Sequence, residues 1–223
     1  MDHESRPGVC AKKSARDRLI RLAMSHADWA IGFEDETWWS RLAMPSLHAW
    51  GESGQPLHLV QQSVAKGDSD PKALACYGLL VQSVHGDGRP LEEVWLRFVD
   101  GRPVGRTTTA FLEWSCSKLE ELGKSALLLV WDNASWHISA QVRGWVREHN
   151  RQVKRSGKGV RIVSCFLPIK SPWLNPIEPH WIHGKRRVVE ADDLLTAQEL
   201  IDRVCAHFGC SHEEHLAVPE NVS

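Results

Sequence analysis

Residues 127–137, LLLVWDNASWH, carry the pattern that decides the fold. An unbroken apolar run leads into Trp131, and the acid and amide side chains of Asp132 and Asn133 follow at once. A short aliphatic run without alternating polar positions is typical of a strand buried on both faces of a sheet. Ligands of such sheets bind beyond the carboxyl ends of the strands. The sequence therefore predicts a buried strand that delivers Asp132 to a site at the sheet edge.

The other periodic segments predict a mixed sheet flanked by helices. Three or four consecutive strands come first, and alternating helices and strands follow, so the later strands should be parallel and covered by helices. The expected strands are 29–34, 57–64, 73–84, 91–99, 126–132 and 160–166. The expected helices cover 107–122, the segment after 137, and segments that begin near Ser14, Asn175 and Thr196. We expect one domain over 29–210, preceded by a tail and short helix (1–28) and followed by a tail (211–223).

Two of these helices carry capping signals. Ser14 with Asp17, and Thr196 with Glu199, have the spacing of a capping box. The helix after 137 should bury one stripe of residues and expose a basic one. The buried stripe is Ile138, Val142, Trp145, Val146 and His149, and the basic stripe is Arg143, Arg147, Arg151 and Lys154.

Composition excludes several classes of protein. At 223 residues, 42% hydrophobic and 25% charged, the chain has an ordinary globular composition, and its longest apolar run is too short to span a membrane. The six cysteines suggest free thiols rather than a disulfide framework, and the Cys/His crowding at 205–215 matches no common zinc spacing. A cytoplasmic protein is expected. The net charge of −1 argues against nucleic-acid binding by bulk charge, but residues 143–161 form a local basic patch.

Three acids stand at the ends of expected elements. Asp35 ends the first strand, Asp132 ends the buried strand, and Glu178 begins a helix. Strand alternation separates Asp35 from Glu34 and Glu36, which should face the other side of the sheet. Carboxylates that meet at one edge repel one another unless a cation lies between them, and their hard oxygens suit Mg²⁺ or Mn²⁺.

Each acid also has a purely structural interpretation. Asn175, Pro176 and Glu178 suit the N-cap, N1 and N3 positions of a helix, so Glu178 could be only a capping glutamate. Asp132 could be a turn residue, and Asp35 one of several crowded surface acids. Asn133 and His137 could orient a metal-bound water or contact a phosphate, or serve only in capping and core packing.

Three segments around these acids resemble the signature blocks of a known family. FEDETWW (33–39), VWDNASWH (130–137) and SPWLNPIEPHW (171–181) resemble those of the DDE transposases of the Tc/mariner superfamily, in its bacterial insertion-sequence branch. The resemblance runs over about 11–209. It implies a ribonuclease H-like fold with a mixed five-stranded sheet, and it makes Asp35, Asp132 and Glu178 the metal-binding triad.

The resemblance also implies a mechanism and partners. Two Mg²⁺ or Mn²⁺ ions would support hydrolysis at the ends of an element and then transfer of the 3′ ends to target DNA. The implied partners are DNA, a separately encoded helix-turn-helix protein and a second copy of the chain, in a cytoplasmic, nucleoid-associated bacterial setting. The residues expected to contact DNA are Arg143, Arg147, Arg151, Lys154, Arg155, Lys158, Lys185 and Arg186.

Two departures from the family pattern leave alternatives open. The interval from Asp132 to Glu178 is longer than usual, which suggests an inserted basic loop at 150–159. Few residues precede the first strand, so the helix-turn-helix region that usually reads the element's ends is not expected. The alternatives are a catalytically dead relic that binds DNA or serves as a scaffold, and a nuclease of the ribonuclease H or junction-cleaving type.

Overall fold

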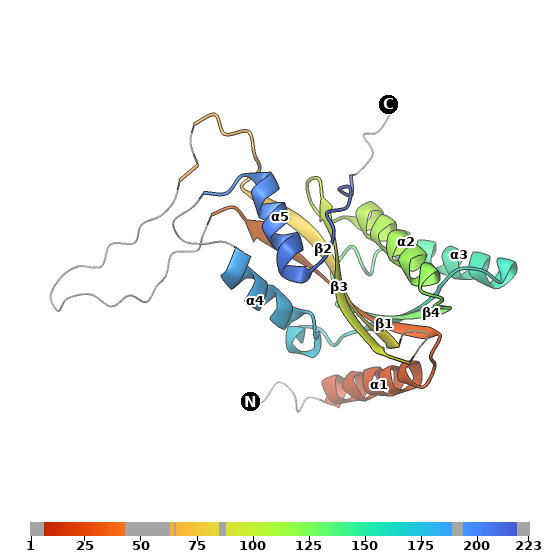
Figure 1. Ribbon diagram of the computed structural model, residues 1–223. Coiled ribbons are helices and arrows are strands. Elements are labelled where there is room, and N and C mark those ends of the chain that lie inside the picture. The colour runs from red at the N-terminus through yellow and green to blue at the C-terminus, as the bar shows by residue number, and fades with distance from the viewer. Residues whose placement is uncertain (1–6, 43–62, 65, 85–87, 189–193, 218–223) are drawn as a thin grey trace.

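The computed structural model describes residues 7–42, 63–64, 66–84, 88–188 and 194–217, which are built around one five-stranded sheet (Figure 1). The strand order is β3-β2-β1-β4-β5. β1 pairs antiparallel with β2, and β2 with β3, whereas β4 lies parallel to both β1 and β5. The strands are β1 (Trp29–Ser40), β2 (Ala73–Val84), β3 (Pro90–Val99), β4 (Ala126–Trp131) and β5 (Arg161–Phe166). The predicted mixed sheet of five strands is therefore confirmed.

Helices cover both faces of this sheet. On one face lie α1 (Pro7–Met24), α4 (Glu178–Val188) and α5 (Ala197–Phe208), and on the other lie α2 (Gly105–Glu121) and α3 (Ala140–Ser156), as Figure 1 shows. All six side chains of β4 are buried, because helices pack on both sides of it. Within the described part of the chain, no helix combines the length and apolar character that crossing a bilayer requires.

Alternating residues of the strands divide the core into two layers. Ile31 and Phe33 of β1 belong to the layer under α1, α4 and α5, together with Leu128 of β4. Ala30 belongs to the layer under α2 and α3, together with Leu127. This period of two also separates the acids of β1, because Asp35 continues the first set whereas Glu34 and Glu36 continue the second.

The amino-terminal helix is longer than predicted. It begins at Pro7, so Ser14 and Asp17 lie inside α1 and the proposed capping box there is wrong. Asp17 instead accepts hydrogen bonds from the guanidinium of Arg16. The capping box at Thr196 is confirmed, since the backbone N–H of Glu199 donates to Thr196 Oγ1 and the Thr196 N–H donates to the Glu199 carboxylate.

The region around α3 also differs from the prediction. Ile138 precedes the helix and is 41% exposed, so it does not belong to the buried stripe, whereas Val142 is fully buried. The basic segment predicted as an inserted loop is helical as far as Ser156, and α3 ends at Gly157, whose φ of 67° suits glycine. The strand expected at 57–64 falls outside the described residues except for 63–64, which form no strand.

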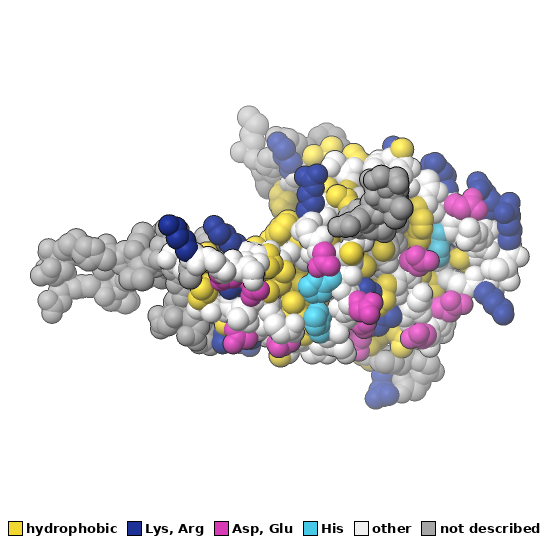
Figure 2. Space-filling model, turned by 90° about the horizontal axis from the view of Figure 1, so that it is seen from above, with side chains coloured by type: hydrophobic (Ala, Val, Ile, Leu, Met, Phe, Trp, Pro, Cys, Tyr) yellow, Lys and Arg dark blue, Asp and Glu magenta, His cyan; other side chains and the backbone are white. Residues whose placement is uncertain are grey.

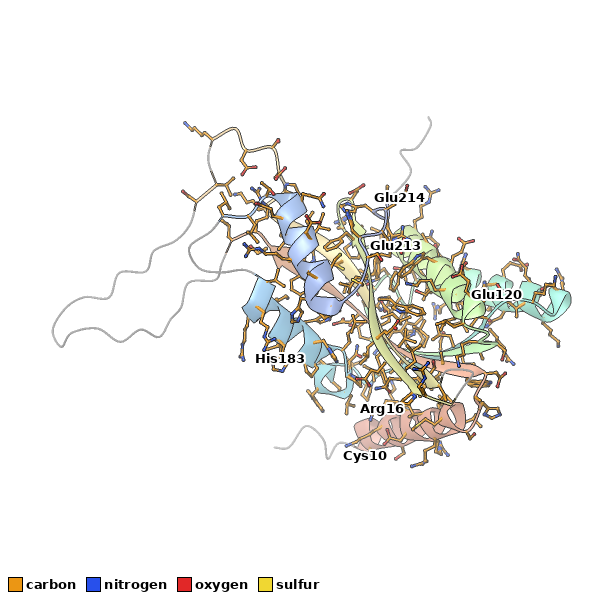
Figure 3. The ribbon with its side chains drawn as sticks, viewed as in Figure 1. Cys10, Arg16, Glu120, His183, Glu213 and Glu214 are labelled. Carbon is orange, nitrogen blue, oxygen red and sulfur yellow. The ribbon has the colours of Figure 1, made fainter. Side chains whose placement is uncertain are left out.

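The segment after α5 lies along β3. Leu216 forms a parallel bridge with Val99, and its N–H donates to the Phe98 carbonyl. The side chain of Arg97 donates to the carbonyl of Glu214, which Figure 3 places with Glu213 beside this strand. These contacts fix residues 211–217 to the edge of the sheet.

Candidate active site

The register of the sheet brings two of the predicted acids side by side. Phe33 of β1 pairs with Val130 of β4, and the two strands are parallel. Extending this register by two residues places Asp35 level with Asp132. The prediction that Asp35 ends its strand is wrong, because β1 continues to Ser40 in pairing with β2. Asp35 instead lies just beyond the part of β1 that pairs with β4, and this brings it beside Asp132 at the carboxyl end of β4.

The third acid comes from the loop between β5 and α4. Glu178 is the first residue of α4, and two side-chain hydrogen bonds hold the loop before it. Asn175 donates from Nδ2 to the Glu34 carbonyl at 2.9 Å, and Arg16 of α1, labelled in Figure 3, donates to the Leu174 carbonyl at 2.7 Å. The loop is thus fixed to β1 and to α1.

The structural interpretation of Glu178 as a capping-box residue does not hold. Asn175 donates from its side-chain amide to β1, and its buried Oδ1 has no hydrogen-bond partner in the part of the chain that the structure describes. The helix begins at Glu178 rather than one turn earlier, so this carboxylate lies at the helix mouth. Its position there needs another explanation.

All three acids line one pocket. Its volume is about 250 Å³, and its walls come from the middle of β1, the residues just after β4 and the loop that leads to α4. Besides Asp35, Asp132 and Glu178, the lining residues include Asn133, Leu167, Ile169, Lys170 and Ser171. The amide of Asn133 donates to the Leu167 carbonyl, which ties the β4 end of the pocket to the β5 end.

The electrostatics of this pocket favour a bound cation. Burial, followed by the negative charge of Glu178, raises the pKa of Asp35 to about 7, although a hydrogen bond from Trp181 acts in the opposite direction. Burial also raises the pKa of Glu178, and Asp132 adds to this effect. Asp35 and Glu178, whose ionised forms are disfavoured beside neighbouring carboxylates, fit a divalent metal ion, which would relieve the repulsion.

A glycine that the sequence reasoning missed makes room for the residue that orients Asp35. Gly78 of β2 lies directly opposite Asp35 in the sheet, and a Cβ there would overlap the ring of Trp181. The indole of Trp181 instead passes over the glycine and donates from Nε1 to Asp35 Oδ2 at 2.9 Å. A glycine inside a strand often marks the place where another group approaches the backbone closely, so Gly78 was the signal in the sequence for a side chain packed at this point.

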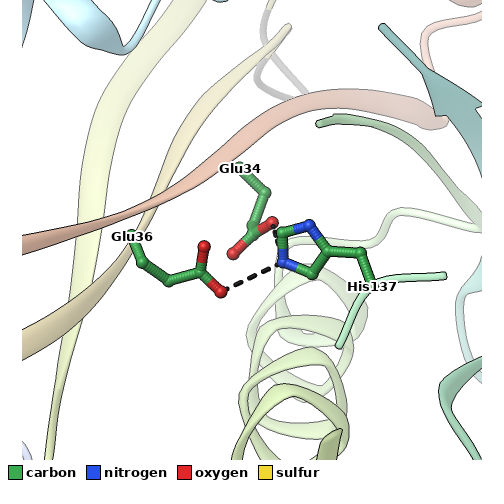
Figure 4. Close-up of side chains that lie close together, drawn as sticks. All are labelled: Glu34, Glu36 and His137. Carbon is green, nitrogen blue, oxygen red and sulfur yellow. Dashed lines mark hydrogen bonds and ion pairs between the residues drawn. The ribbon is translucent and has the colours of Figure 1, made fainter. Parts of the chain in front are cut away.

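On the opposite face of the sheet, a buried histidine lies among three acids. His137 is fully buried, and its Nε2 lies 3.2 Å from Glu34 Oε2 and 3.0 Å from Glu36 Oε1, as the dashed lines in Figure 4 mark. Its Nδ1 lies 2.9 Å from Asp132 Oδ1. Burial alone would lower the pKa of His137, but Glu34, Asp132 and Glu36 together raise it to about 11. The ring is therefore an imidazolium that donates from both nitrogens.

This imidazolium fixes one oxygen of Asp132. Oδ1 accepts from His137 and from the Ala134 N–H at 2.8 Å. Although partial burial opposes ionisation, these hydrogen bonds lower the pKa of Asp132. His137 is fully buried, which leaves no room for the predicted direct contact with a phosphate, and its ring instead contacts Asp132.

The predicted DNA-contacting residues are all exposed, but they do not surround the acids. Arg147, Arg151 and Lys154 line a groove with Arg161, which begins β5. Ser125, just before β4, also lines it, so this groove lies at the opposite end of the strand from Asp132, about 20 Å away. Figure 2 shows Lys and Arg side chains gathered at the end of the molecule where Figure 1 places α3.

The remaining basic residues lie in two places. Arg143 is near the start of α3, whereas Arg155 and Lys158 lie at its end. Lys185 and Arg186 are in the last turn of α4, the helix that begins with Glu178. The positive charge of Lys185 partly offsets the rise in the pKa of Glu178. Figure 3 places His183 on the same helix.

Part of the chain matches a known family of endonucleases. Residues 92–201 match the model of the DDE superfamily endonucleases, a range that contains Asp132 and Glu178 but not Asp35. No curated protein matches the sequence significantly.

Solved structures of Mos1 transposase have the same fold. The Mos1 mariner paired end complex with Mn matches with a TM-score of 0.59 at 13% identity, over 94% of this chain and 56% of that one. The paired-end complex with left transposon end matches with a TM-score of 0.57 at 14% identity, over 91% and 54%. The paired end complex with Mg matches with a TM-score of 0.58 at 13% identity, over 93% of this chain and 57% of that one. The fold is ribonuclease H-like, as predicted, and the chain spans just over half the length of these transposases.

Proposed function

Because the chain carries a DDE superfamily endonuclease domain of the Tc/mariner type, we propose that it cleaves DNA strands and transfers the 3′ ends to target DNA in divalent-metal-dependent reactions. The observation that carries the proposal is the pocket in which Asp35, Asp132 and Glu178 meet from three separate elements. Carboxylates so arranged need a cation, and phosphoryl transfer needs charge stabilisation and positioning.

The three acids would hold two Mg²⁺ or Mn²⁺ ions. When bound, such ions lower the pKa of an attacking water or 3′-hydroxyl and stabilise the leaving oxygen of an in-line displacement. Two of the similar Mos1 structures are complexes with Mn and with Mg, which is consistent with this choice of metals for a protein of the same fold.

The side chains around the acids would keep them in place. The Trp181 indole holds Oδ2 of Asp35, and the His137 imidazolium and the Ala134 N–H hold Oδ1 of Asp132. Glu178 is carried by a loop that Asn175 ties to β1. Preorganised ligands of this kind keep a metal site within the narrow geometry that catalysis requires.

DNA would lie across the acid pocket and along the basic side chains. Arg143 would contact DNA from the first turn of α3 and Lys185 from the last turn of α4. Arg147 and Lys154 would contact it from the groove that they line with Arg161. Such contacts position the backbone without reading sequence. A separately encoded helix-turn-helix protein and a second copy of the chain are the proposed partners for recognition of element ends.

Incubation with supercoiled plasmid and Mn²⁺ tests the proposal. We expect the wild-type chain to produce nicked and linear products and the Asp132→Asn variant to produce none, while Glu121→Gln, a change of an exposed acid at the end of α2, should keep wild-type activity. Equal inactivity of all three proteins would favour the dead-relic alternative. Preferential cleavage of RNA–DNA hybrids or branched DNA would favour the other nuclease classes.

A further inference from the structure

A second pocket lies against the same two acids on the opposite face of the sheet. It has a volume of about 370 Å³, within the range of about 300–1,000 Å³ in which proteins bind small ligands. Asp35 and Asp132 belong to the lining of both pockets. The other residues of the second pocket are Glu36, Trp38, Arg102, Pro103, Ala134 and Trp136.

Three separate segments build this pocket. Trp38 lies near the end of β1 on the face of Glu36, Arg102 precedes α2, and Trp136 follows β4. Because Asp35 and Asp132 line both pockets, a polynucleotide whose phosphate lies at these acids would have an adjoining nucleotide in the second pocket. We propose that this pocket binds the base of a nucleotide next to the scissile phosphate, against the indoles of Trp38 and Trp136. The inference rests on the proposed function.

The two indoles have the properties of a stacking surface. Trp38 leaves 49% of its surface exposed, so its ring is accessible to a ligand. Trp136 is held in place, since its Nε1 donates to Glu36 Oε1 at 2.6 Å and its ring meets His137 edge-on at 5.9 Å. Aromatic rings bind any unpaired base through its π-face, so the site should accept all four bases.

One cation, Arg102, lies at this pocket beside the carboxylates of Asp35, Glu36 and Asp132. Arg102 is exposed at the pocket lining and supplies a cation for a phosphate oxygen. The base cannot reach the pocket while it is paired in a duplex, so the adjoining nucleotide has to be unpaired or unstacked on binding. Recognition would thus favour strand ends and distorted duplexes.

Photo-crosslinking tests where the base lies. Short single-stranded oligonucleotides, each with one 5-iodouracil at a different position, are bound to the wild-type chain in Ca²⁺ and irradiated, and the crosslinked residue is found by mass spectrometry. We expect crosslinks to Trp38 or Trp136. Crosslinks only elsewhere, for example to Trp173, which is equally exposed at 49%, would overturn the inference.

A coupling measurement gives the energetic test. Trp38→Ala should weaken the affinity for an unmodified oligonucleotide by about fivefold to a hundredfold. Trp38→Phe should weaken this affinity much less, because a phenyl ring still stacks on a base. An abasic nucleotide at the crosslinking position should remove the difference between Trp38→Ala and wild type. Trp114→Ala on α2, outside all three pockets described, serves as control and should leave affinity unchanged.

The outcomes separate this inference from the proposed function. A wild-type chain that cuts plasmid and binds DNA, but whose affinity does not respond to Trp38→Ala, contradicts the base site alone. A wild-type chain that neither cuts nor binds DNA contradicts both. If Trp38→Ala instead dissociates a dimer and leaves DNA affinity unchanged, the exposed indole is a contact between copies and the base site is overturned.

Discussion

Replacement of His137 by phenylalanine should be among the most destabilising single changes in the chain. The imidazolium is fully buried and is the cation between Glu34 and Glu36, while its other nitrogen bonds Asp132. Phenylalanine keeps a ring that can stack on Trp131, whose centroid lies 4.7 Å away, but removes the charge and both hydrogen bonds. The cost is therefore electrostatic rather than steric.

The magnitude follows from what is left behind. Glu34 is 1% exposed, and among the described residues neither of its carboxylate oxygens has a hydrogen-bond partner beyond the ion pair with His137. Removing one member of a buried ion pair costs about 3–5 kcal/mol of unfolding free energy. For a chain of this length each kcal/mol corresponds to about 2–4 °C, so the melting temperature should fall by about 6–20 °C.

Urea denaturation followed by tryptophan fluorescence measures this free energy. His149→Phe is the matched control, because His149 also stacks on a tryptophan, at 5.0 Å from Trp145, but bonds only the Val160 carbonyl, so its loss should cost about 1 kcal/mol. Adding Glu34→Gln to His137→Phe should recover part of the stability. If His137→Phe costs no more than His149→Phe, the buried-imidazolium account is wrong.

The pH dependence provides an independent check. The folded pKa of His137 is raised from 6.5 to about 11, so its contribution to stability is fully present below about pH 6.5 and is lost as pH rises through 11. The stability difference between wild type and His137→Phe should therefore shrink steadily from pH 6.5 to pH 10. A difference that stays constant over this window would contradict an imidazolium.

Three further predictions concern the acids, the glycine and the basic groove. Because the pKa of Asp35 is raised from 3.8 to about 7, the metal-free chain should lose stability as pH rises from about 4 to 7. Scanning fluorimetry at pH 8 should therefore give Asp35→Asn a higher melting temperature than wild type, and a lower one would contradict repulsion between the carboxylates. Gly78→Val should displace Trp181 and lower the free energy of unfolding by about 1–3 kcal/mol or more. Calorimetry should also show weaker Mn²⁺ binding, and an unchanged affinity for Mn²⁺ would mean that Trp181 does not support metal binding. Joint replacement of Arg147 and Lys154 by glutamine should make the plot of log affinity against log salt concentration less steep, by about 0.9 in slope for each phosphate that is no longer neutralised. An unchanged slope would show that these two side chains face solvent and do not contact DNA.

The sequence by itself determined the fold class and named the acids. The apolar run of 126–131 was typical of a strand buried on both sides, and the alternation in β1 assigned Asp35 to one face and Glu34 and Glu36 to the other. Both signals are local, because side-chain direction in a strand has a period of two residues. The roles of the three acids as metal ligands stay a prediction, although the structure brings them to one pocket.

Tertiary structure alone decided what surrounds those acids. Trp181 reaches Asp35 across Gly78, His137 joins Glu34 and Glu36 to Asp132, and the basic stripe of α3 ends at the opposite edge of the sheet from the acids. Most of these pairings join residues about a hundred or more positions apart, and no local periodicity contains them. They depend on the strand order β2-β1-β4 and on which helix packs over which face, which only the packed core determines.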